Sequence, residues 1–179
     1  MRQFLFCVEA NKRSNSDYIY ITEIIKEFYS YDDSKYSFKC IHMGSKTRYN
    51  SNKVNKQINK WIKPFSGKTT VFICVDTDDA RNNYDDQKVL DEIKRYCQEK
   101  EYELIWFCRD IEEVCIEKRI SSEDKVNEAE MFRRRKTVRT IKESNLTHKE
   151  YSNYKSNILN VLDKYLKRYK VRGGERLWN

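Results

Sequence analysis

The sequence predicts an α/β protein with a mainly parallel, four-stranded sheet sandwiched by helices and a C-terminal helical extension. Apolar runs of strand length recur four times before residue 120, and amphipathic segments of helical period separate them. Strands that alternate with helices indicate βαβ units with right-handed crossovers. No convincing strand follows Ser121. We therefore expect residues 1–120 to form one α/β domain and residues 121–179 to form helices packed on it.

The first expected unit is a strand followed by a helix. Residues 2–9, RQFLFCVE, are apolar without alternation, which is typical of a parallel strand buried on both faces. A polar loop follows, and either Asn15 or Ser16 is available as the N-cap of the next helix. That helix repeats apolar residues at spacings of three and four, namely Tyr18, Ile21, Ile25 and Phe28.

The second unit begins with a strand of different character. Residues 36–43 alternate apolar and polar side chains, which predicts a half-exposed strand near a sheet edge. The following helix ends near Pro64 and Gly67. Its apolar stripe consists of Val54, Ile58, Trp61 and Phe65. Residues 69–76, TTVFICVD, then form the third expected strand, which is again apolar throughout.

The remaining elements follow the same alternation before the pattern changes. Asn83 caps a helix that precedes a fourth strand over residues 103–109, and a helix restarts at Asp110. Residues 121–143 favour a helix, and residues 146–170 predict one long amphipathic helix. A capping box of Thr147 and Glu150 would open that last helix. Its apolar stripe would be Tyr151, Tyr154, Ile158, Leu162, Tyr165 and Tyr169.

Composition excludes several classes of protein. The six cysteines form no CxxC pair and no zinc-like spacing with His42 and His148, so we expect reduced thiols and no metal–thiolate site. No apolar run approaches the ~20 residues of a membrane-spanning helix, and the N-terminal residues do not resemble a signal peptide. We therefore expect a cytoplasmic protein with no membrane partner. The net charge of +8 favours polyanionic partners such as DNA or RNA.

Carboxylates follow two of the expected strands at the point where each strand ends. Glu9 closes the first strand, and Asp76 and Asp78 close the third. If the strand order is 2-1-3-4, these ends are neighbours at the switch point of the sheet. Residues two apart on an extended segment point the same way, so both aspartates would face Glu9. Asp79 is either a helix cap or a ligand of a second metal ion.

Clustered carboxylates repel one another unless a cation neutralises them. Hard oxygen donors are the ligands that Mg²⁺ or Mn²⁺ prefers, so the pattern predicts a divalent metal that carries phosphate chemistry. The alternative interpretation is structural, because aspartates commonly cap helices and form turns after strands. Glu9 at the matching end of the first strand favours the metal site.

The order of these elements and motifs resembles the Toprim domain of topoisomerases, primases and OLD-type nucleases over about residues 2–120. The segments FCVEANKRSNSDYIYITEI and FICVDTDD are most similar to small bacterial Toprim proteins of the RloB type, which are linked to phage defence. The resemblance implies Mg²⁺-dependent cutting or joining of nucleic-acid phosphodiesters. It also implies that Glu9 is a general acid/base or metal ligand and that Asp76 and Asp78 are metal ligands.

The sequence departs from that family in one position and matches it loosely in another. Toprim sequences usually place glycine after the glutamate, and this chain has Ala10, which narrows the site or reduces activity. Proteins of the RloB type also carry a glutamate in the helix after the fourth strand. By that resemblance, Glu112 or Glu113 is an accessory residue of the site.

Two sets of basic residues are candidate phosphate contacts. Lys12 and Arg13 lie in the loop after Glu9 and should border the crevice. A second cluster consists of Arg133, Arg134, Arg135, Lys136 and Arg139. The C-terminus adds Lys164, Lys167, Arg168, Lys170, Arg172 and Arg176. Such clusters suit phosphate binding without sequence readout, and the alternative is a solvated helix face.

Three hypotheses of function follow. The first is a metal-dependent Toprim-type nuclease that cleaves DNA or RNA, as an effector of phage defence. The second is a non-catalytic subunit that retains the fold and binds nucleic acid or a partner ATPase, a reading favoured by Ala10. The third is a phosphotransfer or phosphatase domain, although such folds place an aspartate pair on the first strand, where this chain has only Glu9. The sequence leaves the oligomeric state open.

Overall fold

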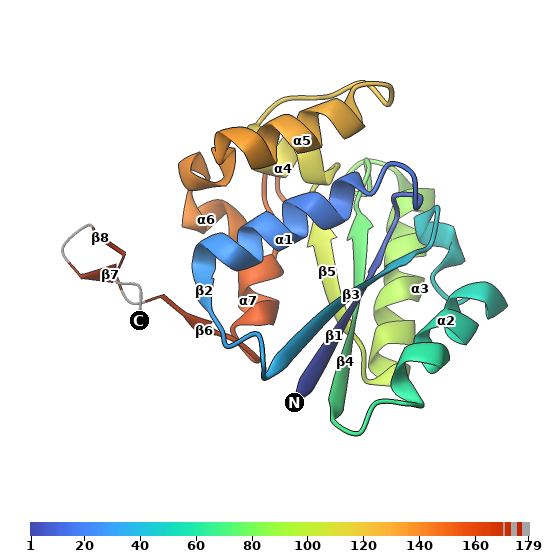
Figure 1. Cartoon of the computed structure of the whole chain (residues 1–179). Coiled ribbons are helices and arrows are strands. Elements are labelled where there is room, and N and C mark those ends of the chain that lie inside the picture. Colours follow the sequence, from blue (N-terminus) through green and yellow to red (C-terminus); the bar gives the residue numbers. More distant parts are fainter. Residues whose placement is uncertain (170, 173–174, 177–179) are drawn as a thin grey trace.

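A parallel sheet of four strands forms the centre of the molecule (Figure 1). The computed structural model describes residues 1–169, 171–172 and 175–176. Its strands are β1 (Arg2–Val8), β3 (Tyr36–His42), β4 (Lys68–Asp76) and β5 (Glu103–Phe107). They are ordered β3-β1-β4-β5 and every neighbouring pair is parallel. The predicted α/β class, parallel sheet and strand order are therefore confirmed.

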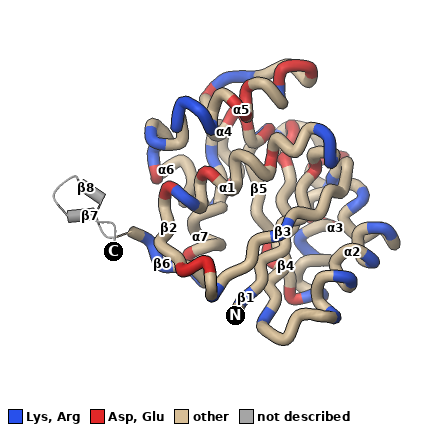
Figure 2. The backbone as a smooth tube through the Cα atoms, viewed as in Figure 1, with Lys and Arg blue, Asp and Glu red and all other residues tan. Residues whose placement is uncertain are grey.

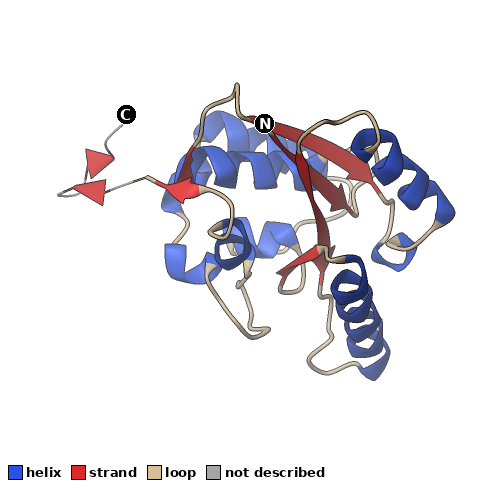
Figure 3. Cartoon of the chain, turned by 90° about the horizontal axis from the view of Figure 1, so that it is seen from below, coloured by secondary structure: helices blue, strands red, loops and turns tan. Residues whose placement is uncertain are grey.

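Helices cover both faces of this sheet, as Figure 3 shows from below. Residues from α2 (Asn52–Ile62) and α3 (Tyr84–Lys100) pack in one cluster. The other face is covered by α1 (Ser16–Phe28), α4 (Ile111–Ile116), α5 (Lys125–Arg135) and α7 (Ile158–Leu162). The shorter elements are β2 (Tyr29–Ser30), η1 (Lys46–Arg48), η2 (Thr137–Thr140), α6 (Glu143–Leu146), β6 (Lys167–Arg168), β7 (Val171–Arg172) and β8 (Glu175–Arg176).

The central strands divide their side chains between these two layers with the period of a strand. Along β1, Phe4 and Phe6 enter the cluster with α1, while Leu5 and Cys7 enter the cluster with α2 and α3. Both sets are fully buried because each face of the sheet carries helices. This explains why the sequence shows a continuous apolar run and no alternation. All six cysteines lie within the described residues and are free thiols.

The edge strand β3 is half-buried, as its alternation predicts. The helix that follows it is less buried than predicted, because Val54 and Ile58 are buried but Trp61 is 38% exposed. Its indole lies at the outer end of α2, where the ammonium of Lys39 on β3 stands 5.2 Å from the ring centroid. A cation–π contact of this kind stabilises an aromatic side chain that stays in contact with water.

The long helix predicted over residues 146–170 is wrong. Turns occupy most of residues 147–157, and α7 has five residues. Thr147 does not cap a helix, since its hydroxyl donates to the carbonyl of Glu143, and Tyr154 has a left-handed φ of 60°. Local propensity loses here because this segment covers the open edge of β5. Lys170 lies outside the described residues, as do the side chains of Arg172 and Arg176.

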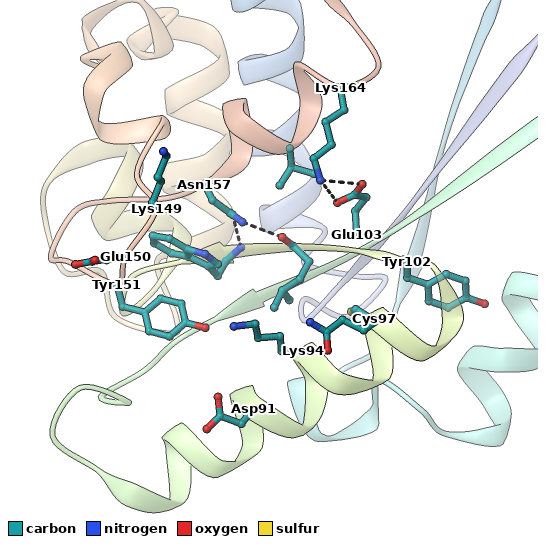
Figure 4. A pocket seen from close by; sticks show the side chains of 14 residues that line it. Asp91, Lys94, Cys97, Tyr102, Glu103, Lys149, Glu150, Tyr151, Asn157 and Lys164 are labelled. Atoms are coloured by element: carbon teal, nitrogen blue, oxygen red, sulfur yellow. Dashed lines mark hydrogen bonds and ion pairs between the residues drawn. The ribbon is translucent and has the colours of Figure 1, made fainter.

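Three consecutive residues cover that edge (Figure 4). The Asn157 side chain accepts from the N–H of Trp106 at 2.9 Å and donates to the carbonyl of Leu104 at 2.9 Å, so one amide replaces a neighbouring strand. Ser156 donates to the carbonyl of Trp106 at 2.6 Å, and the carbonyl of Lys155 accepts from Cys108 at 2.9 Å. A covered edge cannot pair with another chain.

The extension also belongs to the core of the sheet domain. Ala129 and Phe132 of α5 and Leu159 of α7 share one cluster with Phe4 and Phe6 of β1. Tyr20 of α1 packs on Phe132 with ring centroids 4.7 Å apart. Among the described residues, no helix combines the length and the apolar character needed to cross a membrane. The boundary predicted at residue 120 therefore does not separate two cores.

We predict that Asn157→Ala lowers the free energy of unfolding by about 2 kcal/mol, because it leaves two backbone groups of β5 without partners. No cap is lost, since the Asn157 side chain makes no capping bond to α7. Urea denaturation measures the change. The control Asn59→Ala on the exposed side of α2 should stay within about 0.5 kcal/mol, and equal losses in both variants would contradict this role of Asn157.

Candidate active site

Glu9 joins the ends of three parallel strands. It follows β1 directly, and its Oε1 accepts from the N–H of Asp76 at the end of β4, at 2.8 Å. Its Oε2 accepts from the N–H of Lys46, beyond the end of β3, at 3.0 Å. Parallel strands deliver their carboxyl ends to one edge of a sheet, and β1 lies between β3 and β4. The predicted meeting of Glu9 with the end of the third strand is therefore confirmed.

Asp76 is the last residue of β4, and its carboxylate lies at the start of α4. Its Oδ1 accepts from the N–H of Ile111 at 3.1 Å. Burial raises the pKa of Asp76 well above its ordinary value, and the charge of Glu9 adds to that effect. Burial likewise raises the pKa of Glu9 to about 7, although the N–H of Asp76 and the charge of Lys46 act against it. Each group thus disfavours the charged form of the other.

Asp78 does not extend the strand in the way the sequence prediction assumed. The strand ends at Asp76, and Asp78 has a left-handed φ of 47°. Thr77 between them is buried, and its hydroxyl accepts from the N–H of Arg109 at 3.0 Å. The N–H of Asp78 donates to the carbonyl of Arg109, also at 3.0 Å. The loops after β4 and β5 therefore stay paired, and they set the direction of Asp78 in place of strand alternation.

Lys46 is a site residue that the sequence reasoning missed. Its ammonium contacts Oδ2 of Asp78 and lies 3.6 Å from Oδ1 of Asp86, while its side chain is only 8% exposed. The charges of Asp78, Glu9 and Asp86 together raise its pKa against the effect of burial. The rule that locates Glu9 and Asp76 at strand ends would have pointed to this loop after the second strand. Its burial could not have been inferred.

Glu112 and Lys125 form a second charged group on the other side of Asp76. Glu112 is fully buried, and its Oε2 accepts from Nζ of Lys125 at 2.9 Å. The same ammonium lies 3.6 Å from Asp110, and its charge also acts on Asp76. The Oε1 of Glu112 is buried and accepts no hydrogen bond from the described residues. Glu112 is therefore close to the predicted site.

A polar cleft of about 330 Å³ opens beside these groups. Asp79 lies at its rim, where its Oδ1 accepts from the side chain of Asn82 at 2.9 Å, as expected for a residue that stabilises a turn. Glu113 enters the cleft, and its carboxylate lies 3.9 Å from the guanidinium of Arg109. The cleft is lined by Asp78, Asp79, Asp86, Arg109, Asp110, Glu113 and Arg119.

The donor chemistry suits a hard divalent cation, but two lysines stand among the donors. Glu9, Asp76, Asp78 and Glu112 offer carboxylate oxygens, which Mg²⁺ and Mn²⁺ prefer. Within the described part of the chain, however, no three or more Asp, Glu, His or Cys side chains are grouped closely enough to hold a metal ion. The ammonium groups of Lys46 and Lys125 supply the positive charge between the carboxylates.

Ala10 causes no backbone strain at the position where Toprim sequences usually have glycine. It does not adopt a positive φ, so a methyl group is tolerated there. Its N–H donates to the carboxylate of Asp17 at 2.8 Å, which fixes the loop to the start of α1. Asp17 thereby adds a further negative charge close to Glu9 and Asp76.

The structure separates the two predicted sets of basic residues. Lys12 and Arg13 are exposed in the loop directly after Glu9. Arg139 lies 3.8 Å from Glu27 near the end of α1, whereas the carboxylates lie near its start. The 13 residues of α1 span about 18 Å. Figure 2 shows the basic end of α5, with Arg133, Arg134, Arg135 and Lys136, on the side of α6. This cluster is therefore remote from the cleft.

We predict that the carboxyl group of Glu9 titrates with a midpoint of about 7. The folded state then holds an extra proton between pH 4.5 and about 7, so the contribution of Glu9 makes the free energy of unfolding fall as the pH rises through that window. Carbon-detected NMR of the side-chain carboxyl measures the midpoint, and Glu9→Gln identifies the signal. A midpoint at the ordinary value near 4.5 would contradict the burial of this group.

No family model, curated protein sequence or solved structure matches this chain. The resemblance to the Toprim domain therefore depends on the element order, on Glu9 and on the DxD of Asp76 and Asp78. Inference of function starts from the chemistry of these side chains at the switch point of the sheet.

Proposed function

We propose that this protein is a divalent-cation-dependent nuclease of the Toprim type that cleaves phosphodiester bonds of DNA or RNA. One observation carries the proposal: the carboxylate of Glu9 accepts from the N–H of Asp76, so two acidic groups from adjacent strands touch at the switch point. Their raised pKa values reflect an arrangement that needs positive charge to ionise fully. Ligands and catalytic groups of open α/β sheets gather at this place.

Glu9, Asp76 and Asp78 are the residues that would hold Mg²⁺ or Mn²⁺, with Asp79 at the rim for a second ion. A bound divalent ion supplies charge neutralisation and Lewis-acid activation of a phosphate or water. Glu9 also keeps its role as general base in this proposal, because a pKa of about 7 suits proton transfer near neutral pH. Buried Glu112 is the accessory carboxylate nearest to Asp76.

Cationic groups near the cleft favour a nucleic-acid substrate. Arg109 and Arg119 line the cleft, and Lys12 and Arg13 border it from the loop after Glu9. Phosphate contacts of this kind set affinity and orientation without reading sequence. The remote cluster at the end of α5 would extend the contact to a longer strand or bind a partner, such as the ATPase of a phage-defence system in the cytoplasm.

A second candidate function is a non-catalytic subunit that binds nucleic acid or a partner protein. The observation that favours it is the pairing of Lys46 with Asp78 and of Lys125 with Glu112, which balances the carboxylates without a metal ion. Such a subunit would use the basic cluster of α5 as its interface, and Glu9 and Asp76 would be dispensable for its binding.

We predict that Asp76→Asn lowers the cleavage rate by at least about 100-fold without lowering the melting temperature. The neutral amide removes the anionic oxygen that the reaction needs, yet its Oδ1 can still accept from the N–H of Ile111. Because burial disfavours the charged form of Asp76, the neutral replacement costs no electrostatic stability. Cleavage of labelled single-stranded DNA, duplex DNA and RNA in Mg²⁺ or Mn²⁺ measures the rate.

The control for this experiment is Asp33→Asn, an identical change in an exposed loop, which should leave cleavage unchanged. Absence of cleavage by the wild-type protein on all three substrates, together with no metal binding in calorimetry, would remove the nuclease proposal. Cleavage that survives Asp76→Asn would assign the activity to other residues.

We further predict that replacing Arg133, Arg134 and Arg135 together by alanine weakens retention of nucleic acid and reduces its dependence on salt. Each phosphate contact that is lost lowers the slope of log affinity against log salt by about 0.7 to 0.9. Fluorescence anisotropy at several salt concentrations measures both quantities. The double variant Lys12→Ala/Arg13→Ala is the comparison, and an effect confined to this pair would place the bound strand at the cleft alone.

A further inference from the structure

We infer that Lys46 is an internal counter-ion of the candidate active site, whose ammonium occupies the carboxylates in the metal-free protein and is displaced when a divalent cation binds. The inference rests on the proposed function, since it concerns the same carboxylates. It assigns to Lys46 a role that neither the sequence motifs nor the Toprim resemblance supplies.

The backbone fixes Lys46 beside the carboxylates before its side chain makes any contact. Gly44, with a φ of 81°, turns the chain after β3, and Lys46 opens the short helix η1. The N–H of Lys46 donates to Oε2 of Glu9 at 3.0 Å. The ammonium therefore starts from a position that the carboxylate of Glu9 has already set, and it reaches only into the cleft.

The contacts of the ammonium show what it replaces. It touches Asp78 from the loop after β4 and lies 3.6 Å from Asp86 in the first turn of α3. The charge of Glu9 also acts on it. Three acidic residues from different elements thus surround one cation with a side chain that is 8% exposed. A charge buried to this degree needs paired opposite charge, and so do the carboxylates.

A divalent cation and this ammonium need the same oxygens. Asp78 is a predicted metal ligand, and its Oδ2 is already in contact with Nζ of Lys46. Binding of a metal ion at Glu9, Asp76 and Asp78 would place its two positive charges beside the ammonium, which would repel it. Metal binding must then break the Lys46–Asp78 ion pair, and the energy of that pair is subtracted from the metal affinity.

Lys125 shows why this role belongs to Lys46. Lys125 pairs with Glu112 and Asp110, which lie on and before α4, and its side chain is 29% exposed. It does not contact Asp78 or Glu9 through any ion pair among the described residues. Lys125 can therefore keep its partners when a cation binds at Asp78, whereas Lys46 cannot.

Calorimetric titration of the full chain with Mg²⁺ alone tests the inference. Lys46→Met removes the competitor but keeps the length of the side chain, and we expect the dissociation constant for Mg²⁺ to fall about tenfold. In EDTA this variant should melt at a lower temperature than the wild type, because the carboxylates lose their counter-ion, and saturating Mg²⁺ should remove the difference. The control is Arg119→Met, which removes one positive charge from the same cleft and should change the constant by no more than about threefold.

NMR of the wild-type protein gives a readout that needs no variant. The ammonium of Lys46 should show a slowly exchanging signal without metal, and this signal should vanish with the same Mg²⁺ midpoint as the calorimetric isotherm. Mg²⁺ binding with an unchanged ammonium signal, or an equal gain in Arg119→Met, would overturn the inference and leave the metal site standing. If neither the wild type nor Lys46→Met binds Mg²⁺, the proposed function fails together with the inference.

Discussion

The carboxylate of Glu9, shared between the N–H groups of Asp76 and Lys46, is the contact on which the candidate site depends. It stands at the end of β1, between β3 and β4, so its two oxygens tie together three segments that are far apart in sequence. Two backbone donors favour the ionised form of Glu9, whereas burial opposes it more strongly and raises its pKa to about 7. The chain around Glu9 supplies positive charge for this reason.

Two lysines provide that charge in different ways. Lys46 is nearly buried against Asp78 and Asp86, and Lys125 bridges Glu112 and Asp110 at the water-accessible side of α5. An acidic cluster with built-in counter-ions remains folded without metal, since its repulsion is compensated. The same counter-ions set how strongly a metal ion must bind to take their place. This constraint links the stability of the fold to the chemistry proposed for the cleft.

The C-terminal segment completes the sheet domain and also shapes its surface. Asn157 and its neighbours satisfy the open edge of β5, and the aromatic and apolar residues around α7 fill the core beneath α1. A cavity of about 600 Å³ lies beside this edge, lined in part by Lys94, Tyr151 and Lys164 (Figure 4). None of the predicted carboxylates lines it. The polar cleft at the strand ends is therefore the place where charge and fold converge.

The sequence by itself determined the class of fold, the order of its strands and the meeting of Glu9 with Asp76. These features follow from hydrophobic periodicity and from the rule that parallel strands expose their carboxyl ends at one edge, both of which are local or topological. Tertiary structure alone decided the rest. Residues 147–157 gave up a helical pattern because Ser156 and Asn157 found partners on β5, and Asp78 turned away from the strand because Thr77 is bonded to Arg109. The burial of Lys46 depends on charges from three separate elements, and no local pattern encodes such a sum.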